Sequence, residues 1–127
     1  MNKKVIFFHP YFSDGGVERT NLGLAKGLIE NGYRVVFLTT SYTNHFMNEI
    51  NELGIELKSL GDKPISKTIF DVVKYLNKLS QNEEIIFVSC QYYVNIISMF
   101  ISKIVKYRKN IVFINSERNH LDEFRIN

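Results

Sequence analysis

The chain has 127 residues, which is enough for one folded domain and too few for two complete hydrophobic cores. Its hydrophobic share of 45% and charged share of 23% are those of an ordinary globular protein, so disordered, collagenous and low-complexity classes are excluded. The formal net charge of +3 is too weak to indicate a nucleic-acid-binding protein, and we expect no nucleic acid as a partner.

Hydrophobic spacing predicts alternating strands and helices along the first half of the chain. A buried strand at 4–8 is followed by a glycine turn, a helix ending at the Asn31-Gly32 pair, a second buried strand at 34–39 and a short helix at 44–53. Residues 54–58 alternate apolar with charged side chains, which is typical of an edge strand with one wet face. The first helix is expected to bury Val17, Asn21, Leu24, Ala25 and Leu28.

The second half continues the alternation. Pro64 and Ser66 are expected in the first turn and at the cap of a helix whose apolar face is Ile69, Val72, Val73, Leu76 and Leu79. A strand at 85–88, a helix at 92–107 and a strand at 111–115 follow. The uncharged stretch 85–102 is close to the minimum length of a membrane span, but a strand followed by a separate helix explains its spacing better.

Alternating strands and helices with short connections predict a parallel sheet with helices on both faces. We therefore expect a three-layer, Rossmann-like, doubly wound α/β domain over residues 1–127, with strand order 3-2-1-4-5. The winding then reverses between the first and fourth strands, where ligands bind at the carboxyl ends. The loops 9–16, 89–91 and 115–120 are the predicted site region.

Gly15 and Gly16 lie in the first of these loops, where a helix begins. Two glycines can take positive φ and let an anion such as a diphosphate approach the unpaired amides of the helix start, although a plain tight turn explains them too. A dinucleotide site needs three spaced glycines and an acid after the second strand, where this chain has Thr39-Thr40-Ser41. A P-loop needs a Gly-Lys-Ser/Thr sequence, which does not follow the turn.

These residues resemble the N-terminal domain of glycosyltransferase family 4, which contains retaining enzymes of the GT-B type. Residues 15–19 (Gly-Gly-Val-Glu-Arg) match the family's glycine-glycine-hydrophobic-glutamate-arginine motif. Residues 21–28 and 31–35 are similar to its "L-A-x-x-L-x-x-x-G-H-x-V" pattern, and residues 116–119 (Ser-Glu-Arg-Asn) are similar to a segment found at the end of the fifth strand.

The resemblance implies the acceptor-side half of a two-domain enzyme that moves a sugar from a nucleotide-diphosphate donor to a glycan or lipid-linked acceptor with retention, as in polysaccharide biosynthesis. It implies that Gly15 and Gly16 face the donor diphosphate or sugar. Arg19 and the loop residues Glu117, Arg118 and Asn119 are further candidates, since arginine pairs with phosphate. The nucleotide sugar is a co-substrate, and no cofactor or metal is expected; the catalytic residues are unknown.

The chain also departs from that family. The donor-binding C-terminal domain, with its two glutamates eight positions apart, has no counterpart here, and residues 89–91 (Ser-Cys-Gln) stand where many members have a histidine. We therefore expect an isolated half without activity, whose partner is the missing domain. The alternative is a non-catalytic anion-binding or interaction module of the same fold that works with a separate partner chain.

The remaining candidates have ordinary explanations. His9, His45 and His120 are expected in loops or at the surface, Asp14 as a helix cap, and Cys90 as a buried thiol. A single cysteine and no secretory leader favour the cytoplasm. For helix 92–107, with the apolar stripe Tyr93, Ile97, Phe100, Ile101 and Ile104 and the basic residues that follow, two interpretations stay open: a wide core face, or peripheral contact with the inner face of an anionic membrane.

Overall fold

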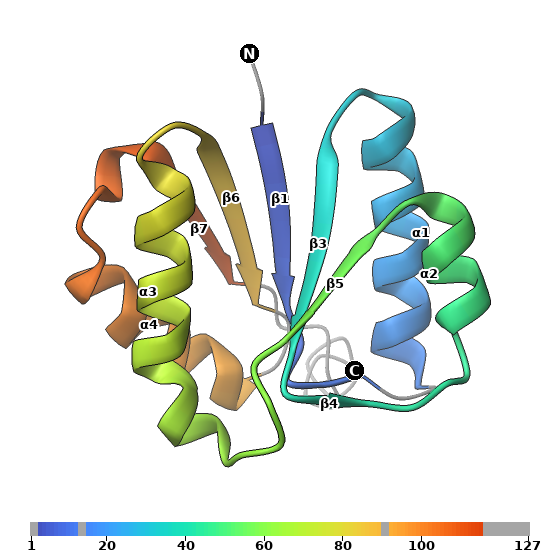
Figure 1. Ribbon diagram of the computed structural model, residues 1–127, viewed down its shortest axis with the longest axis horizontal. Helices are drawn as coiled ribbons and strands as arrows, with labels where there is room; N and C mark the ends of the chain where they lie inside the picture. Colours follow the sequence, from blue (N-terminus) through green and yellow to red (C-terminus); the bar gives the residue numbers. More distant parts are fainter. Residues whose placement is uncertain (1–2, 13–14, 90–91, 116–127) are drawn as a thin grey trace, which may run out of the picture.

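The computed structural model describes residues 3–12, 15–89 and 92–115 and has a central parallel sheet with helices on both faces (Figure 1). The sheet contains five strands in the order β5-β3-β1-β6-β7, all parallel to their neighbours. Counted along the chain, these five follow the expected order 3-2-1-4-5. The strand bounds are β1 Lys3–Phe8, β3 Arg34–Thr39, β5 Glu56–Ser59, β6 Glu84–Ser89 and β7 Ile111–Asn115.

The arrangement differs in one detail from the expectation. Two short strands, β2 (Tyr11–Phe12) and β4 (Ser41–Tyr42), form a separate parallel pair beyond the carboxyl ends of β1 and β3. Their pairing is anchored by the Pro10 carbonyl oxygen, which accepts hydrogen bonds from the Thr40 amide at 2.6 Å and the Thr40 hydroxyl at 2.7 Å. The loop after β1 is therefore fixed to the β3 side before the chain enters the first helix.

The helices divide between the two faces as a doubly wound sheet requires. α1 (Gly16–Glu30) and α2 (Met47–Leu53) cover one face, while α3 (Ile69–Ser80) and α4 (Tyr92–Ile104) cover the other (Figure 1). Two 3₁₀ turns, η1 (Ile65–Thr68) and η2 (Arg108–Asn110), precede α3 and β7. Each α-helix lies in a connection between parallel strands, and the face changes because the connection from β5 crosses the sheet to β6.

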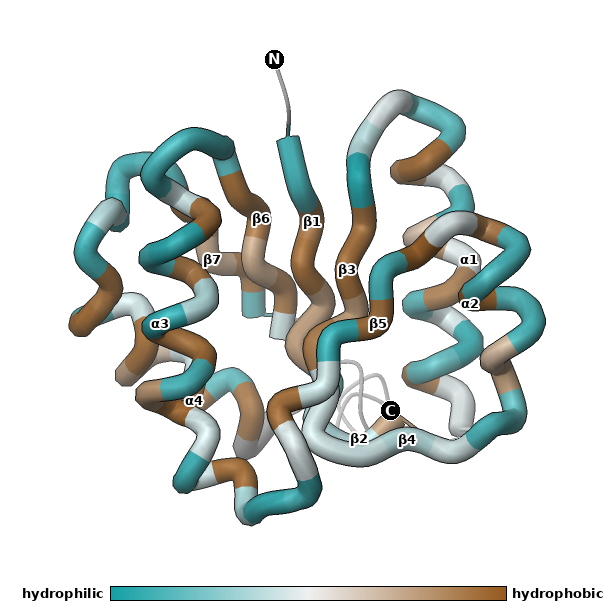
Figure 2. The backbone as a smooth tube through the Cα atoms, viewed as in Figure 1, coloured by the Kyte–Doolittle hydropathy of each residue, from teal (hydrophilic) through white to brown (hydrophobic). Residues whose placement is uncertain are grey.

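The core consists of two apolar clusters, one on each face of the sheet. Alternate side chains of β1 serve opposite faces, so Val5 and Phe7 pack with α1 while Ile6 and Phe8 pack against α3 and α4. Figure 2 shows the hydrophobic segments concentrated on the strands and on the sheet-facing sides of the helices. Because both faces are covered, the central strands are continuous apolar runs, and this is the feature that their sequence displays.

Two sequence predictions about the helices are wrong in detail: the cap of α3, and the buried face and end of α4. Ser66 lies inside η1 and does not cap α3; Pro64 precedes that turn, and neither η1 nor α3 begins with a side-chain cap hydrogen bond. On α4 the buried side chains include Val94, Asn95, Ser98 and Ile101, whereas Phe100 is 57% and Ile104 49% exposed. The predicted α4 stripe is thus rotated relative to the true core face, and the helix ends at Ile104 instead of Tyr107.

Candidate functional site

The start of α1 lies at the carboxyl edge of the sheet, directly after β1 and beside the point where the winding reverses between β1 and β6. Gly15 is the N-cap residue, with φ −81° and ψ −177°, and it provides no side-chain cap. Among the described glycines only Gly32, Gly54 and Gly61 have positive φ. The expectation of positive φ at Gly15 and Gly16 is therefore wrong, since this turn is made from extended backbone that any residue can adopt.

The two glycines serve different purposes. A Cβ atom at Gly15 would lie 2.9 Å from Glu18 Oε1, so Gly15 leaves room for a carboxylate against the backbone. A Cβ atom at Gly16 would meet nothing within 4 Å, and both glycines are exposed. The first turn of a helix has amide groups without intrahelical acceptors. Gly16 thus leaves that end of α1 open to approach from solvent, whereas Gly15 is required by the protein's own packing.

A buried polar cluster lies beneath this helix start. Glu18 and Asn21 are on the first two turns of α1, and both converge on His9, the residue that follows β1. Glu18 Oε2 is 3.3 Å from His9 Nε2, and Asn21 Nδ2 is 3.4 Å from His9 Nδ1. The three residues are 5%, 0% and 1% exposed for Glu18, Asn21 and His9 respectively. His9 lies in the connection after β1, as expected of a loop residue, but it is not a surface residue because its side chain is buried.

Both ring nitrogens of His9 face protein groups, and this decides its role. His9 Nε2 faces the Glu18 carboxylate, and His9 Nδ1 faces the Asn21 side-chain amide. An imidazole held at both nitrogens and shielded from solvent is suited to fixing geometry, whereas a general base needs one nitrogen facing its substrate. The cluster joins the end of β1 to α1 and so fixes the position of the open helix start.

Aromatic packing also supports the connection between the end of β1 and α1. The Phe12 ring is 1% exposed and lies 5.2 Å from the His9 ring and 5.0 Å from the Phe37 ring, measured between centroids. Phe12 belongs to β2, so the small second sheet carries this ring into the core between β1, β3 and α2. The polar cluster therefore packs, through His9, against buried aromatic side chains.

On the other side of the winding reversal, the ends of β6 and β7 are joined by hydrogen bonds. The Ser89 hydroxyl is fully buried and lies 2.6 Å from Asn95 Oδ1 of α4 and 2.9 Å from Asn115 Oδ1 of β7. Because the hydroxyl carries a single proton, it donates to one of these oxygens at a time. The contacts join the carboxyl ends of β6 and β7 to each other and to α4. The predicted loop residues 90–91 and 116–120 lie outside the described residues.

Arg19 is exposed on the first turn of α1, and its guanidinium carbon lies 5.8 Å from the centroid of the Phe46 ring. Phe46 is the residue just before α2, so the Arg19 side chain extends from α1 towards α2. Ion pairing with Glu18 is not what the structure shows, because the Glu18 carboxylate is buried against His9. His45, in contrast, is exposed, as expected of a surface histidine.

Several predicted residues lie outside the part of the chain that the structure describes. They are Asp14, Cys90, Glu117, Arg118, Asn119 and His120. The residues that sequence reasoning missed are His9, Glu18 and Asn21 as a unit. A signal for two of them exists, since Glu18, Asn21, Leu22 and Ala25 follow helical spacing and define the buried face that the structure shows.

Within the described ranges, no three side chains of His, Cys, Asp or Glu are grouped so that they could hold a metal ion. No helix in the described part of the chain is both long enough and apolar enough to cross a membrane.

Comparison with known proteins adds no family to this description. No protein-family model matches the chain, and no curated protein matches it.

Proposed function

We propose that this chain is the acceptor-side domain of a two-domain glycosyltransferase that uses a nucleotide-diphosphate sugar. The observation that carries the proposal is the open start of α1: Gly16 is exposed, nothing lies within 4 Å of its Cβ position, and the helix begins beside the winding reversal of a doubly wound sheet. Amides of this kind bind anions because they combine unsatisfied donors with the positive end of the helix dipole.

The proposed mechanism assigns the α1 start to the leaving diphosphate. Negative charge develops on that group as the sugar–phosphate bond breaks, and a fixed amide donor is worth roughly 3 kcal/mol of transition-state stabilisation. The His9–Glu18–Asn21 cluster acts as a positioning device, because it fixes α1 relative to β1. The donor nucleotide would be held by a second domain facing this edge, and the acceptor, a glycan or lipid-linked sugar, would lie on the present domain. Transfer with retention is part of the proposal.

The surface of α4 is consistent with an acceptor held at a membrane. Exposed apolar side chains, with basic side chains close by in sequence, occupy α4 and the segment after it; they are Ile96, Met99, Phe100, Ile104, Lys103, Lys106, Arg108 and Lys109. Apolar groups beside basic ones match an anionic lipid surface. We include peripheral contact with the inner face of such a membrane in the proposal.

A second candidate function is a non-catalytic anion-binding or interaction module that works with a separate partner chain. The observation that favours it is the burial of the His9–Glu18 pair. These two groups are engaged with each other, so their contact provides no proton donor or acceptor to a substrate.

Radiolabelled sugar transfer from a mixture of nucleotide-sugar donors separates the two candidates. The gene product that carries this chain together with its donor-binding half is expected to transfer label, and Gly16→Ala is expected to lower turnover at least tenfold because a methyl group blocks access to the first-turn amides. Gly23→Ala is the matched control, since this α1 glycine also has nothing within 4 Å of its Cβ position.

Equal turnover in the two variants would contradict the role assigned to Gly16. Absence of transfer with every donor would contradict the enzyme proposal and favour the binding module. The isolated chain is expected to give no turnover, and measurable transfer by it alone would show that the catalytic centre does not need a second domain.

A further inference from the structure

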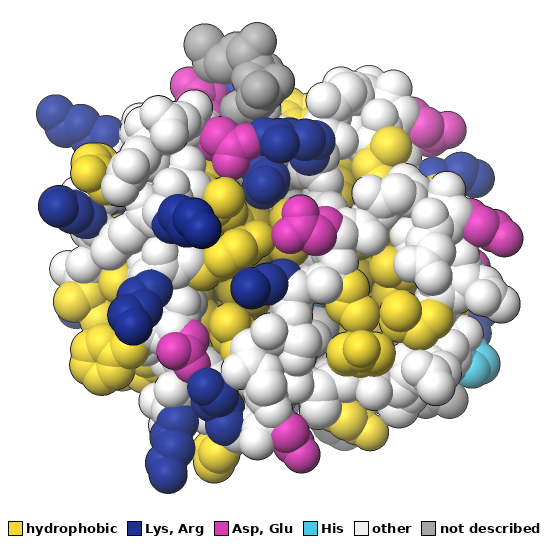
Figure 3. Space-filling model, viewed as in Figure 1, with side chains coloured by type: hydrophobic (Ala, Val, Ile, Leu, Met, Phe, Trp, Pro, Cys, Tyr) yellow, Lys and Arg dark blue, Asp and Glu magenta, His cyan; other side chains and the backbone are white. Residues whose placement is uncertain are grey.

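A hollow lies on the α3 face of the sheet beside the edge strand β5, on the opposite face from α1. Its volume is about 390 Å³, within the range of small-molecule sites. One wall is α3 and the other is β5 with the turn that follows it; the lining residues are Lys58, Ser59, Leu60, Lys63, Asp71, Lys74, Tyr75 and Lys78. Figure 3 shows basic side chains gathered around an apolar hollow on this side of the molecule.

The charge in this hollow is strongly one-sided. Four of the lining residues are lysines and one is an aspartate. Lys63 Nζ donates to Asp71 Oδ2 at 2.7 Å, so that pair is neutral overall. Among the residues that the structure describes, no ion pair involves Lys58, Lys74 or Lys78. Lys74 and Lys78 are one helical turn apart on α3, a spacing at which like charges destabilise a helix.

The floor and rim of the hollow are held in place. The Lys58 ammonium lies 5.9 Å from the centroid of the Tyr75 ring, which fixes this cation over an aromatic face. Burial, together with the nearby Glu56 carboxylate, raises the pKa of Tyr75 to about 12, so the phenol is neutral and adds no negative charge.

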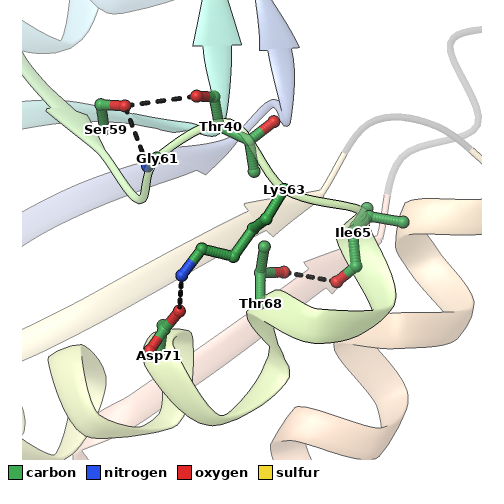
Figure 4. A network of polar contacts seen from close by, with 7 residues as sticks. All are labelled: Thr40, Ser59, Gly61, Lys63, Ile65, Thr68 and Asp71. Atoms are coloured by element: carbon green, nitrogen blue, oxygen red, sulfur yellow. Dashed lines mark hydrogen bonds and ion pairs between the residues drawn. The ribbon is translucent and has the colours of Figure 1, made fainter.

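Hydrogen bonds hold the turn after β5 at both of its ends (Figure 4). The Ser59 hydroxyl donates to the Thr40 carbonyl oxygen at 3.3 Å and accepts from the Gly61 amide at 3.2 Å, and Gly61 has a φ of +93° that favours glycine. At the other end, the Lys63–Asp71 contact ties the turn to α3. The wall that carries Ser59, Leu60 and Lys63 is therefore ordered before a ligand arrives, which reduces the entropy lost on binding.

The geometry points to a binding site for a ligand that carries two or more phosphate groups, contacted by Lys58 from β5 and by Lys74 and Lys78 from α3. Lysine binds phosphate as a point charge, and all the basic lining residues of the hollow are lysines. Two cations about 6 Å apart at Cβ, and a third on the opposite wall, match a multiply charged anion better than a single phosphate. This site does not depend on the proposed sugar transfer.

Titration with sodium pyrophosphate, followed by amide chemical shifts of the full chain, tests the site. We expect saturable shifts at residues 58–63 and 71–78 with millimolar or tighter affinity. The double variant Lys74→Gln/Lys78→Gln should weaken binding about tenfold, from the typical contribution of two exposed charge contacts. Lys26→Gln, on the exposed surface of α1 on the opposite face, is the matched control and should bind as the unaltered chain does.

Asp71→Asn should change the affinity for pyrophosphate in the opposite direction to the lysine substitutions. It removes the one carboxylate of the hollow and releases Lys63, so pyrophosphate should bind several-fold more tightly. Each variant is checked by circular dichroism, and all the substituted lysines are exposed, so the fold is expected to persist.

Absence of saturable shifts up to about 10 mM pyrophosphate, or equal affinity in the lysine double variant and the Lys26→Gln control, would overturn the site. A second experiment, with lipid vesicles, distinguishes a lipid headgroup from a soluble molecule as the source of the phosphate groups. Sedimentation with vesicles that contain a bisphosphorylated lipid, lost in the double variant, would assign the phosphates to a lipid headgroup; pyrophosphate binding without sedimentation would assign them to a soluble molecule.

Discussion

Gly15 and Gly16 are adjacent, yet substituting each of them by alanine should have opposite effects on stability. At Gly15 the new methyl group would lie 2.9 Å from Glu18 Oε1 and would force the carboxylate away from His9. At Gly16 the methyl group would meet nothing within 4 Å and would enter open space. We therefore expect Gly15→Ala to destabilise the chain and Gly16→Ala to leave it folded and as stable or more stable.

The size of the Gly15→Ala effect follows from two contributions. Alanine is a poorer N-cap residue than glycine by about 0.5–1.5 kcal/mol. Moving the buried Glu18 carboxylate away from its contact with His9 costs about 1.5–3 kcal/mol. The free energy of unfolding should therefore fall by about 2–4.5 kcal/mol. Gly16→Ala should change it by between zero and about +1 kcal/mol, since alanine is the better helix former.

Urea denaturation followed by far-ultraviolet circular dichroism measures both effects. With a slope near 1.5 kcal/mol per molar urea, Gly15→Ala should lower the midpoint by about 1.3–3 M. In a Glu18→Ala background the carboxylate is absent, so the Gly15→Ala effect should fall to the cap contribution of about 1 kcal/mol. Equal midpoints for Gly15→Ala and the unaltered chain, or a Gly15→Ala effect that is undiminished in the Glu18→Ala background, would refute this explanation.

Two further predictions concern the support of the site and the hollow beside β5. Phe12→Ala should lower the free energy of unfolding by about 3–5 kcal/mol, because the ring is buried between His9 and Phe37. Tyr11 is the neighbouring control; its side chain is 54% exposed, so Tyr11→Ala should cost no more than about 0.5 kcal/mol. Similar losses of stability in the two variants, measured by urea denaturation, would contradict the role of Phe12. The hydrogen bond from Lys63 lowers the pKa of Asp71 below its ordinary value of 3.8, so the ionised carboxylate stabilises the fold above that value. The stabilisation is lost as the pH falls through the lowered pKa, and the stability of the unaltered chain relative to Asp71→Asn should decrease between about pH 5 and pH 2; a pH-independent difference in urea midpoint would exclude the contact as its cause.

The order of the sheet was predictable because it depends on local patterns and a chiral rule. Continuous apolar runs at 4–8, 34–39 and 85–88 mark strands covered on both faces, and helical spacing between them forces parallel crossovers. The wet face predicted at 54–58 agrees with the edge position of β5, whose residues are mostly exposed. The α3 face was predictable for the same reason, since Val72 and Leu76 are fully buried and Ile69, Val73 and Leu79 pack around them.

The face of α1 was only partly predictable from apolar spacing. Asn21 and Ala25 are buried as expected, but Glu18, which lies outside that pattern, is buried as well. Leu24, which belongs to the apolar pattern, is 46% exposed. Burial of a carboxylate and an amide is costly unless each finds a polar partner. His9 provides that partner from the end of another element, and the sequence gives no local indication that residues nine and twelve positions apart meet.

The amino-acid sequence by itself determined the class of the domain, its strand order and the position of the glycine turn at the carboxyl edge, because these depend on periodicity within short segments. The tertiary structure alone decided which glycine has free space at its Cβ position, that His9 is buried between Glu18 and Asn21, and that lysines of β5 and α3 line one hollow. These features depend on distances between elements far apart in the chain, and such distances are set by how the layers pack around the sheet.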